Sequence, residues 1–250
     1  MSGVLDLMWQ RPNSSEFPKI WRTFKVKDLE SDAFVEYQIQ DLPESRSEEA
    51  VEFMIKIFCS DEPLTEAHEG TKDANAIEYF RLIWKSLLMQ KMTLACFEYG
   101  SDEIVGISVN YVKCKGDTFW EELDRKIRSE STDRISELMS LLCEKFDPFK
   151  QYAVDMYLDT QAIAIKKKYR GRGIAEHFLR CSKFICKEFK IKLTSTIFTS
   201  DFSNRIADKN GFKLDKIIRY EDIRNAYPNL NVPHINSSAM TIKSIFFDDI

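Results

Sequence analysis

Hydrophobic positions alternate in some stretches of the chain and recur at helical spacing in others. Residues 34–40 (FVEYQIQ) alternate, which predicts a first strand. Apolar residues at positions 50, 51, 54, 55 and 58 then form one stripe of a helix. Ser45 and Glu48, spaced as a capping box, mark the expected start of this helix, and Pro63 marks its end.

The same patterns continue to the C-terminus and predict one mixed α/β domain over residues 34–250. Helices are expected over residues 73–91, 134–147, 174–189 and 203–210, the last ended by Gly211 in a left-handed cap. Two strands within residues 92–113 form a hairpin, and further strands are expected over 154–165, 191–199, 212–221 and 238–247. Residues 1–33 show weak periodicity, and we expect them to be a loosely attached N-terminal extension.

Composition narrows the class of protein without assigning a function. The 250 residues are 44% hydrophobic and 12% aromatic, as in a folded globular protein. A net charge of −4 argues against nucleic-acid binding by overall positive field and is compatible with a cationic substrate. Apolar runs stay well short of the roughly 18 residues that span a membrane, and the start lacks signal-peptide features. We therefore expect a cytoplasmic monomer without a membrane partner.

The six cysteines contain no CxxC pair, and three histidines could join them. This spacing argues against a zinc site and favours reduced, mostly buried thiols. We expect no metal.

A basic turn before the helix at 174–189 carries the strongest chemical signal. Five cations (Lys166, Lys167, Lys168, Arg170 and Arg172) and two glycines (Gly171 and Gly173) precede the helix, with no carboxylate among them. A helix N-terminus has unpaired N–H groups and a partial positive charge, and glycines let an anion approach the backbone. The turn is neither a Walker A loop nor a Rossmann fingerprint. It matches R-x-x-G-x-A from Arg170 to Ala175, and it predicts a pyrophosphate site.

The segment AIAIKKKYRGRGIAEHFL (162–179) resembles the acyl-CoA-binding motif of the GCN5-related N-acetyltransferases. Three further segments, FCSDEPL (58–64), TSDFSNRIADKNGF (199–212) and VPH (232–234), resemble the insect arylalkylamine N-acetyltransferase branch of that superfamily. The resemblance runs from about Phe34 to the C-terminus. It implies a largely antiparallel central sheet with flanking helices and a β–loop–α site for acyl-CoA. Acetyl-CoA would be the co-substrate and a small amine the acceptor.

The resemblance also implies how CoA is held. Backbone groups of Ile163, Ala164 and Ile165 would bind the thioester carbonyl and the pantetheine arm. The pyrophosphate would lie on the turn and the helix start, which comprise Arg170, Gly171, Arg172, Gly173, Ile174 and Ala175.

Acyl transfer to an alkylamine, whose pKa is about 10, requires a base to remove the amine proton. Glu62 is the candidate base, because it lies in a turn beside Pro63, a candidate substrate-binding residue. The alternative is that Glu62 is only part of a polar helix end.

The departing CoA thiolate also needs a proton or a hydrogen-bond donor. Many members of the superfamily use a tyrosine at the position of Ala207, so this chain departs from that pattern. The branch instead implies roles for Thr199, Ser200 and Ser203, of which Ser203 is also a candidate N-cap. His234 matches a histidine near the acceptor pocket.

The sequence leaves several hypotheses about the function open. The leading one is direct acetyl transfer to an arylalkylamine. The acceptor could instead be agmatine, a polyamine or an amino acid, or the donor could carry a longer acyl chain; acidic groups near the acceptor pocket would favour diamines. A CoA-binding protein without turnover, and a nucleic-acid module using KKKYRGR, are the readings from other classes.

Overall fold

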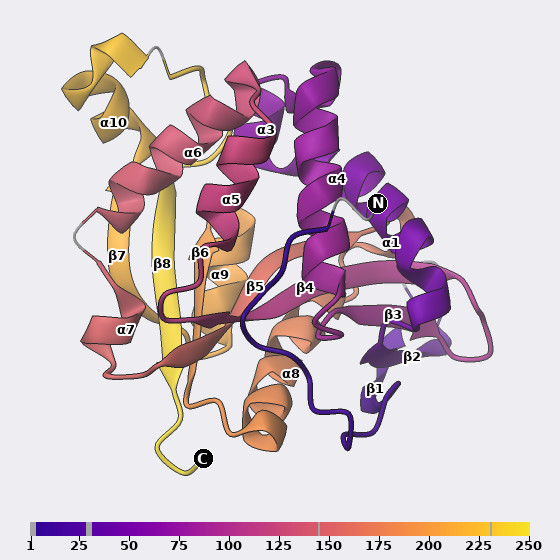
Figure 1. Cartoon of the computed structure of the whole chain (residues 1–250). Coiled ribbons are helices and arrows are strands. Elements are labelled where there is room, and N and C mark those ends of the chain that lie inside the picture. The colour runs from indigo at the N-terminus through magenta and orange to yellow at the C-terminus, as the bar shows by residue number, and fades with distance from the viewer. Residues whose placement is uncertain (1–3, 29–31, 145, 231) are drawn as a thin grey trace.

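Strands pair into one sheet in the computed structural model, which describes residues 4–28, 32–144, 146–230 and 232–250. Within these residues the sheet has eight strands in the order β1-β2-β3-β4-β5-β6-β8-β7 (Figure 1). All neighbours are antiparallel except β5 and β6, which are parallel. The strands are β1 (Ile20–Lys27), β2 (Phe34–Asp41), β3 (Leu94–Glu98), β4 (Ile104–Cys114), β5 (Met156–Ile165), β6 (Leu193–Phe198), β7 (Lys213–Arg219) and β8 (Ala239–Phe246).

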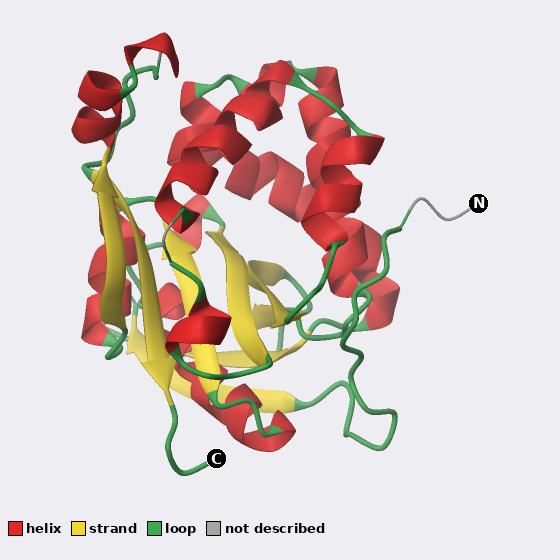
Figure 2. Cartoon of the chain, turned by 60° about the vertical axis from the view of Figure 1, so that its left-hand side comes forward, coloured by secondary structure: helices red, strands yellow, loops and turns green. Residues whose placement is uncertain are grey.

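Helices cover both faces of this sheet (Figure 2). The α-helices are α1 (Ser47–Phe53), α2 (Cys59–Asp61), α3 (Pro63–Ala67), α4 (Ala74–Leu88), α5 (Phe119–Lys126), α6 (Glu130–Cys143), α7 (Pro148–Gln151), α8 (Ile174–Phe189), α9 (Asp201–Lys209) and α10 (Tyr220–Ala226). A π-helical turn, η2 (Met54–Phe58), joins α1 to α2. Short 3₁₀ turns are η1 (Glu44–Arg46), η3 (Gly70–Lys72), η4 (Lys167–Tyr169) and η5 (Pro228–Leu230).

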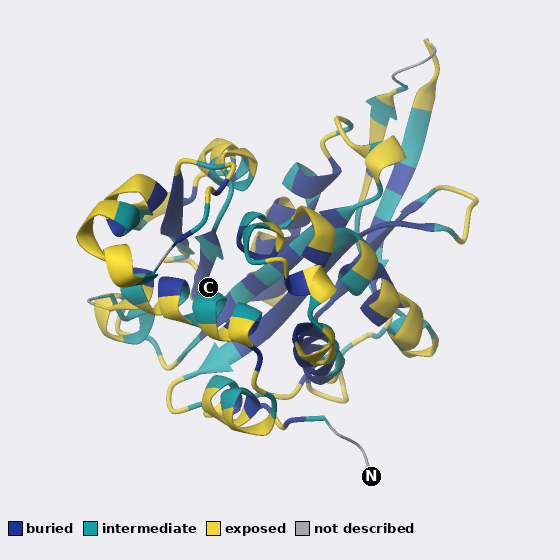
Figure 3. Ribbon diagram, turned by 90° about the horizontal axis from the view of Figure 1, so that it is seen from above, coloured by how far each residue is buried: buried dark blue, intermediate teal, exposed yellow. Residues whose placement is uncertain are grey.

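The core lies in layers on either side of the central strands. On one face, α4 packs its apolar side against Ile107 and Val109 of β4. On the other face, α8 packs against Val105 and Val112 of the same strand. Because β4 is covered on both faces, its residues 104–112 are all buried and mostly apolar, with Ser108 and Asn110 as the polar exceptions. Figure 3 shows the buried residues concentrated in these strands and on the inner sides of the helices.

The mixed α/β class with a largely antiparallel sheet is confirmed. The helix expected at 174–189 is α8, and the hairpin within 92–113 is β3 and β4. Helices α5 and α10 were missed, because one follows a polar loop and the other begins inside a stretch expected to be a strand.

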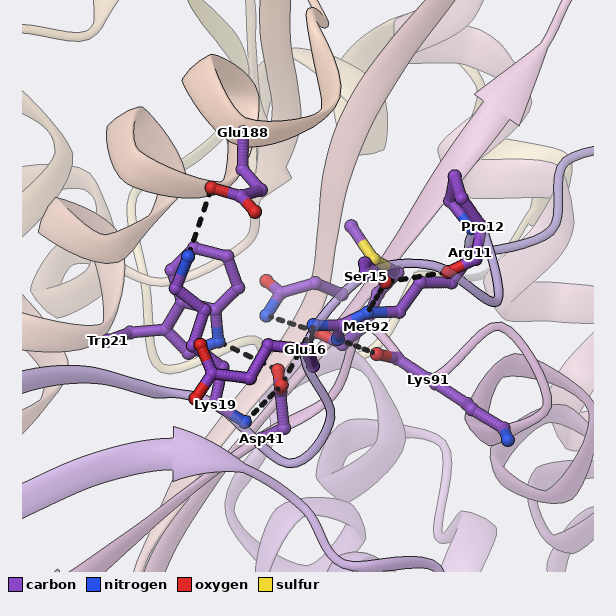
Figure 4. Close-up of polar contacts among 11 residues, drawn as sticks. Arg11, Pro12, Ser15, Glu16, Lys19, Trp21, Asp41, Lys91, Met92 and Glu188 are labelled. Carbon is purple, nitrogen blue, oxygen red and sulfur yellow. Dashed lines mark hydrogen bonds and ion pairs between the residues drawn. The ribbon is translucent and has the colours of Figure 1, made fainter.

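The expectation of a loosely attached N-terminal extension is wrong for the described residues before position 34. Residues 20–27 form β1, which pairs with β2 along its length. Farther upstream, Arg11 forms a buried ion pair with Asp41 at 3.0 Å, and both side chains are at most 3% exposed. Asp41 also accepts hydrogen bonds from the Lys19 N–H and the Trp21 indole (Figure 4). The sequence pattern was weak because Phe24 is the one residue of β1 that is buried.

The first helix begins differently from the prediction, but the helical run ends where it was expected. Residues Glu44–Arg46 form the 3₁₀ turn η1, and no side chain caps either this turn or α1, so the Ser45–Glu48 capping box is wrong. The helical run does end before Pro63, because the residue preceding a proline avoids helical geometry. Pro63 then occupies the first position of a new helix, α3, which the sequence did not indicate.

Candidate active site

Strands β5 and β6 lie side by side at one end and separate at the other. Their register contains a single pair, Leu158 with Thr194. The pairing of β5 with β4 shifts between Thr160 and Ala162, so Gln161 is the extra residue of a β-bulge. Beyond this bulge β5 keeps β4 as its neighbour but has no paired strand on the β6 side. The sheet is therefore open between β5 and β6 from residue 161 onward.

Backbone groups of β5 point into this opening. Lys166 donates its N–H to Val105 of β4 at 3.0 Å, so Lys166 faces β4. Because antiparallel residues alternate in the direction of their N–H and C=O groups, Ile163 and Ile165 face the opening while Ala164 faces β4. The Ile165 carbonyl accepts a hydrogen bond from Arg170 Nε at 3.0 Å. Two of the three predicted backbone ligands, Ile163 and Ile165, thus border the opening.

The glycine turn leads from this opening to the start of α8. Gly171 and Gly173 have φ angles of 78° and 74°, which favour glycine. Gly173 is the N-cap of α8, and no side chain caps the helix. The first-turn N–H groups of α8, including those of Ile174 and Ala175, therefore lack intrahelical partners. This is the arrangement that binds a phosphate group.

The cations of the turn are mostly paired with carboxylates from distant parts of the chain. Lys166 and Lys168 lie 2.8 and 3.1 Å from Glu103, and these contacts, with one from the Tyr169 hydroxyl, lower the pKa of Glu103 to about 2. Arg170 pairs with Asp61.

Arg172 lies 3.4 Å from Asp28, its side chain is 10% exposed, and it donates to the Lys168 carbonyl. Lys167 is exposed and, within the described part of the chain, has no carboxylate partner. Four of the five cations that surround the two glycines are therefore paired with carboxylates, and the N–H groups at the start of α8 are further candidate anion ligands.

Glu62 lies between α2 and α3 with both carboxylate oxygens hydrogen-bonded. Its backbone is extended (φ −74°, ψ 125°), and it is the N-cap of α3. Oε2 accepts from the N–H and the hydroxyl of Thr65 at 2.7 and 2.8 Å. Oε1 accepts from the Thr199 hydroxyl at 2.7 Å. Glu62 thus caps a helix and also faces the end of β6.

The three hydroxyl residues after β6 have different surroundings. Thr199 contacts Glu62 directly. Ser200, and not Ser203 as expected, is the N-cap of α9: its Oγ accepts from the Ser203 N–H at 3.0 Å and donates to Ser203 Oγ at 2.8 Å. Ser203 is the third residue of the helix and completes a capping box. The cap assignment is shifted because the helix begins two residues earlier than the pattern indicated.

Comparison with solved structures identifies the family of this fold and site. A protein of the yellow fever mosquito Aedes aegypti, described as arylalkylamine N-acetyltransferase 7, is 33% identical in sequence to this chain. Its structure matches with a TM-score of 0.88. This match covers 96% of this chain and all of that one. The chain belongs to the arylalkylamine N-acetyltransferase family. It is an acyl-CoA-dependent acetyltransferase of the GCN5-related superfamily, with acetyl-CoA as co-substrate, and the resemblance seen in the sequence is confirmed.

Two other solved structures share the fold of this N-acetyltransferase at lower identity. Arylalkylamine N-acetyltransferase 2 of Aedes aegypti is 19% identical, covers 85% of this chain and 99% of its own, and has a TM-score of 0.71. A polyamine N-acetyltransferase of Drosophila melanogaster that forms N-acetylagmatine is 18% identical over 84% of this chain and 100% of its own, with a TM-score of 0.67. No protein-family model and no curated protein matches the chain.

Three further positions that the sequence singled out in the N-acetyltransferase differ in their surroundings. His234 is exposed in the segment before β8, and within the described residues its imidazole makes no hydrogen bond or ion pair. Ala207, where the superfamily tyrosine would stand, is fully buried in α9. Pro63 fixes the start of α3 beside Glu62.

The structure adds two residues that the sequence did not mark. Tyr220, the first residue of α10, is 1% exposed and donates its hydroxyl to the Thr199 carbonyl at 2.8 Å. Asp159 of β5 accepts from the Thr196 hydroxyl at 3.2 Å, and burial raises the pKa of Asp159 to about 6. Neither residue lies in a recognisable motif, because each becomes part of the site through packing of distant strands.

Among the described residues, no cluster of three or more His, Cys, Asp or Glu side chains could hold a metal ion. All six cysteines are free, and four are buried. Where the structure is described, no helix is both long and apolar enough to cross a membrane.

Proposed function

We propose that this N-acetyltransferase transfers the acetyl group of acetyl-CoA directly to a small primary amine, with an arylalkylamine as acceptor. The observation that carries the proposal is the hydrogen bond between Glu62 and Thr199. It joins the carboxylate of Glu62, in the DEPL segment, to the residue that follows β6, the strand beside the opening. A carboxylate held near that opening is a suitable base for acyl transfer to an amine.

The pyrophosphate of CoA would rest on the N–H groups at the start of α8, at the turn formed by Gly171 and Gly173. The pantetheine arm would extend along the open edge of β5. Its amides would pair with backbone groups of Ile163 and Ile165, in the manner of an added strand. Arg170 would have to leave the Ile165 carbonyl for this pairing to form.

In the chemical step, Glu62 would accept a proton from the attacking amine, directly or through water. The amine nitrogen then forms a bond to the thioester carbon, and the carbonyl oxygen becomes an oxyanion that a β5 backbone N–H can stabilise. Collapse of this intermediate breaks the C–S bond and releases the CoA thiolate.

Hydroxyl groups after β6 are the candidate partners of the departing thiolate. Ser200 and Ser203 hydrogen-bond each other at the cap of α9, and both are half-buried. Thr199 instead orients Glu62 with its hydroxyl. We place Pro63 at the acceptor side of Glu62 and His234 at the entrance for the acceptor, as the family resemblance implies.

A second candidate acceptor class is favoured by Asp159. This carboxylate lies on β5 beside Thr196 of β6, and Thr199 follows the end of that strand three residues after Thr196. A half-buried carboxylate is a suitable partner for the second cation of agmatine or a diamine.

The test is thiol release from acetyl-CoA with tyramine, tryptamine, histamine, agmatine and putrescine, for the wild type and for Asp159→Asn. We expect turnover with the aromatic amines, and little change in the variant if the acceptor has one cation. Suppose that turnover is confined to agmatine or putrescine and is lost in Asp159→Asn. The acceptor would then be a dication and not an arylalkylamine. Absence of thiol release with every amine would refute the proposal.

A further inference from the structure

Tyr220 joins the two halves of the site from a distant part of the chain. Its ring belongs to the buried cluster that contains Leu64 of α3, two residues after Glu62. Its hydroxyl reaches the other half and donates to the Thr199 carbonyl at 2.8 Å. Its backbone N–H is held by the Ser238 carbonyl at 3.1 Å. Tyr220 therefore contacts the segments that carry both the base and the residue hydrogen-bonded to it.

We propose that Tyr220 is a positioning residue for the base, because it fixes the Thr199 backbone so that the Thr199 hydroxyl meets Glu62. This inference rests on the proposed function of Glu62. The connection runs from the Tyr220 hydroxyl to the Thr199 carbonyl, and from the Thr199 hydroxyl to Glu62 Oε1 at 2.7 Å. Thr199 follows the last residue of β6 and precedes the cap of α9, so it belongs to neither element. The hydrogen bond from Tyr220 is what restrains its carbonyl.

The Tyr220 hydroxyl stays protonated, and therefore remains a hydrogen-bond donor, across the pH range of an enzyme assay. Burial raises the pKa of Tyr220 above its ordinary value, and the negative charges of Glu62 and Asp201 raise it further. The hydroxyl therefore keeps its proton and remains a donor to the Thr199 carbonyl. The half-buried Thr199 carbonyl that loses this donor is left without its tyrosine partner, which destabilises this arrangement of the backbone.

A double-mutant cycle separates positioning from a general structural role. Tyr220→Phe removes only the hydroxyl, and we expect kcat to fall roughly three- to tenfold, with KM for acetyl-CoA unchanged. Thr199→Ala removes the hydroxyl through which Tyr220 acts. If Tyr220 acts through Thr199, adding Tyr220→Phe to Thr199→Ala lowers kcat no further. Losses that multiply in the double variant would overturn the inference.

Tyr152→Phe is the matched control. Tyr152 also donates its hydroxyl to an acceptor, Asp215 Oδ1 at 2.6 Å, and none of its hydrogen bonds reaches Glu62 or Thr199. Its kcat should equal that of the wild type. An equal fall of kcat in Tyr152→Phe and Tyr220→Phe would show that loss of a tyrosine hydroxyl acts through general stability, and it would overturn the inference.

A crystal structure of Tyr220→Phe gives a readout that does not need turnover. We expect the distance from Thr199 Oγ1 to Glu62 Oε1 to exceed hydrogen-bond range. An unchanged contact would overturn the inference even in an active enzyme. A wild type that turns over no amine would refute the proposed function, and the crystal structure would still decide whether Tyr220 positions Thr199.

Discussion

Substitution of Gly173 by alanine separates anion binding from backbone strain. Gly173 has a φ of 74° and caps α8, and a Cβ added there would have no heavy atom within 4 Å. The protein itself therefore leaves room for the methyl group, and the added Cβ would occupy the space through which an anion approaches the N–H groups of α8. Gly116, in the turn after β4, has a φ of 85° and equally open surroundings, so it reports strain alone.

The two effects have different sizes. A Cβ in the left-handed region costs about 1–2 kcal/mol. For a chain of this length such a cost lowers Tm by about 2–8 °C. Loss of one hydrogen bond to a charged phosphate costs about 1.5–3 kcal/mol, which weakens binding about 10- to 100-fold. Backbone strain should therefore destabilise Gly173→Ala and Gly116→Ala alike, whereas Gly173→Ala alone should lose affinity for acetyl-CoA.

The assay is titration calorimetry with acetyl-CoA, together with thermal unfolding of each ligand-free variant. We expect Gly173→Ala and Gly116→Ala to lose similar Tm, while the first alone loses acetyl-CoA affinity. If Gly173→Ala bound acetyl-CoA within twofold of Gly116→Ala, the pyrophosphate would not lie against this turn, and the assignment of the CoA site would be refuted.

Three carboxylate variants test other parts of the site. Asp28→Asn removes the carboxylate partner of Arg172, so KM for acetyl-CoA should rise roughly three- to tenfold with kcat unchanged. An unchanged KM would show that Asp28, the residue after β1, does not help Arg172 to hold the turn for acetyl-CoA. Asp61→Asn frees the exposed Arg170, and calorimetry should show acetyl-CoA binding up to about fivefold tighter; weaker binding would contradict competition for Arg170. Burial raises the pKa of Asp159 from 3.8 to about 6, so the folded state binds this proton more tightly than the unfolded state does. The wild type should therefore lose stability as pH rises from about 4 to 6, and urea unfolding of Asp159→Asn should lack this loss.

Local patterns predicted those parts of the site that are built from consecutive residues. The turn and helix from Arg170 to Phe189 were placed correctly, because the glycines, the cations and the apolar stripe all lie within one short stretch. Glu62 was found because a proline and an amphipathic helix flank it. Its second role as the cap of α3 was not, since Pro63 indicated a helix end and the short α3 carries little periodicity of its own.

Contacts between distant residues could not be read from the sequence. The basic turn contains no carboxylate, yet Asp28, Asp61 and Glu103 reach it from three other segments. These pairings occupy four of the five cations that the turn would offer to an anion.

Strand β1 was missed for a related reason. Its pairing with β2 shifts in register between Ile20 and Arg22, and Phe24 is its one buried residue, so its sequence lacks the strict alternation of a half-buried strand. Tyr220 and Asp159 carry no local signal either, because α10 and the β5–β6 opening exist only once the sheet has formed.

The most direct test of the account compares the pH dependence of kcat in the wild type and Glu62→Gln. Glutamine keeps an oxygen that can accept from Thr65 and cap α3, so the change removes the base and leaves the fold. We predict that kcat falls at least about 100-fold at pH 7, with acetyl-CoA affinity unchanged. The deficit should narrow as pH approaches about 10, where the amine loses its proton to water. A kcat within threefold of the wild type at pH 7, with the same pH profile, would contradict the assignment of Glu62 as the base.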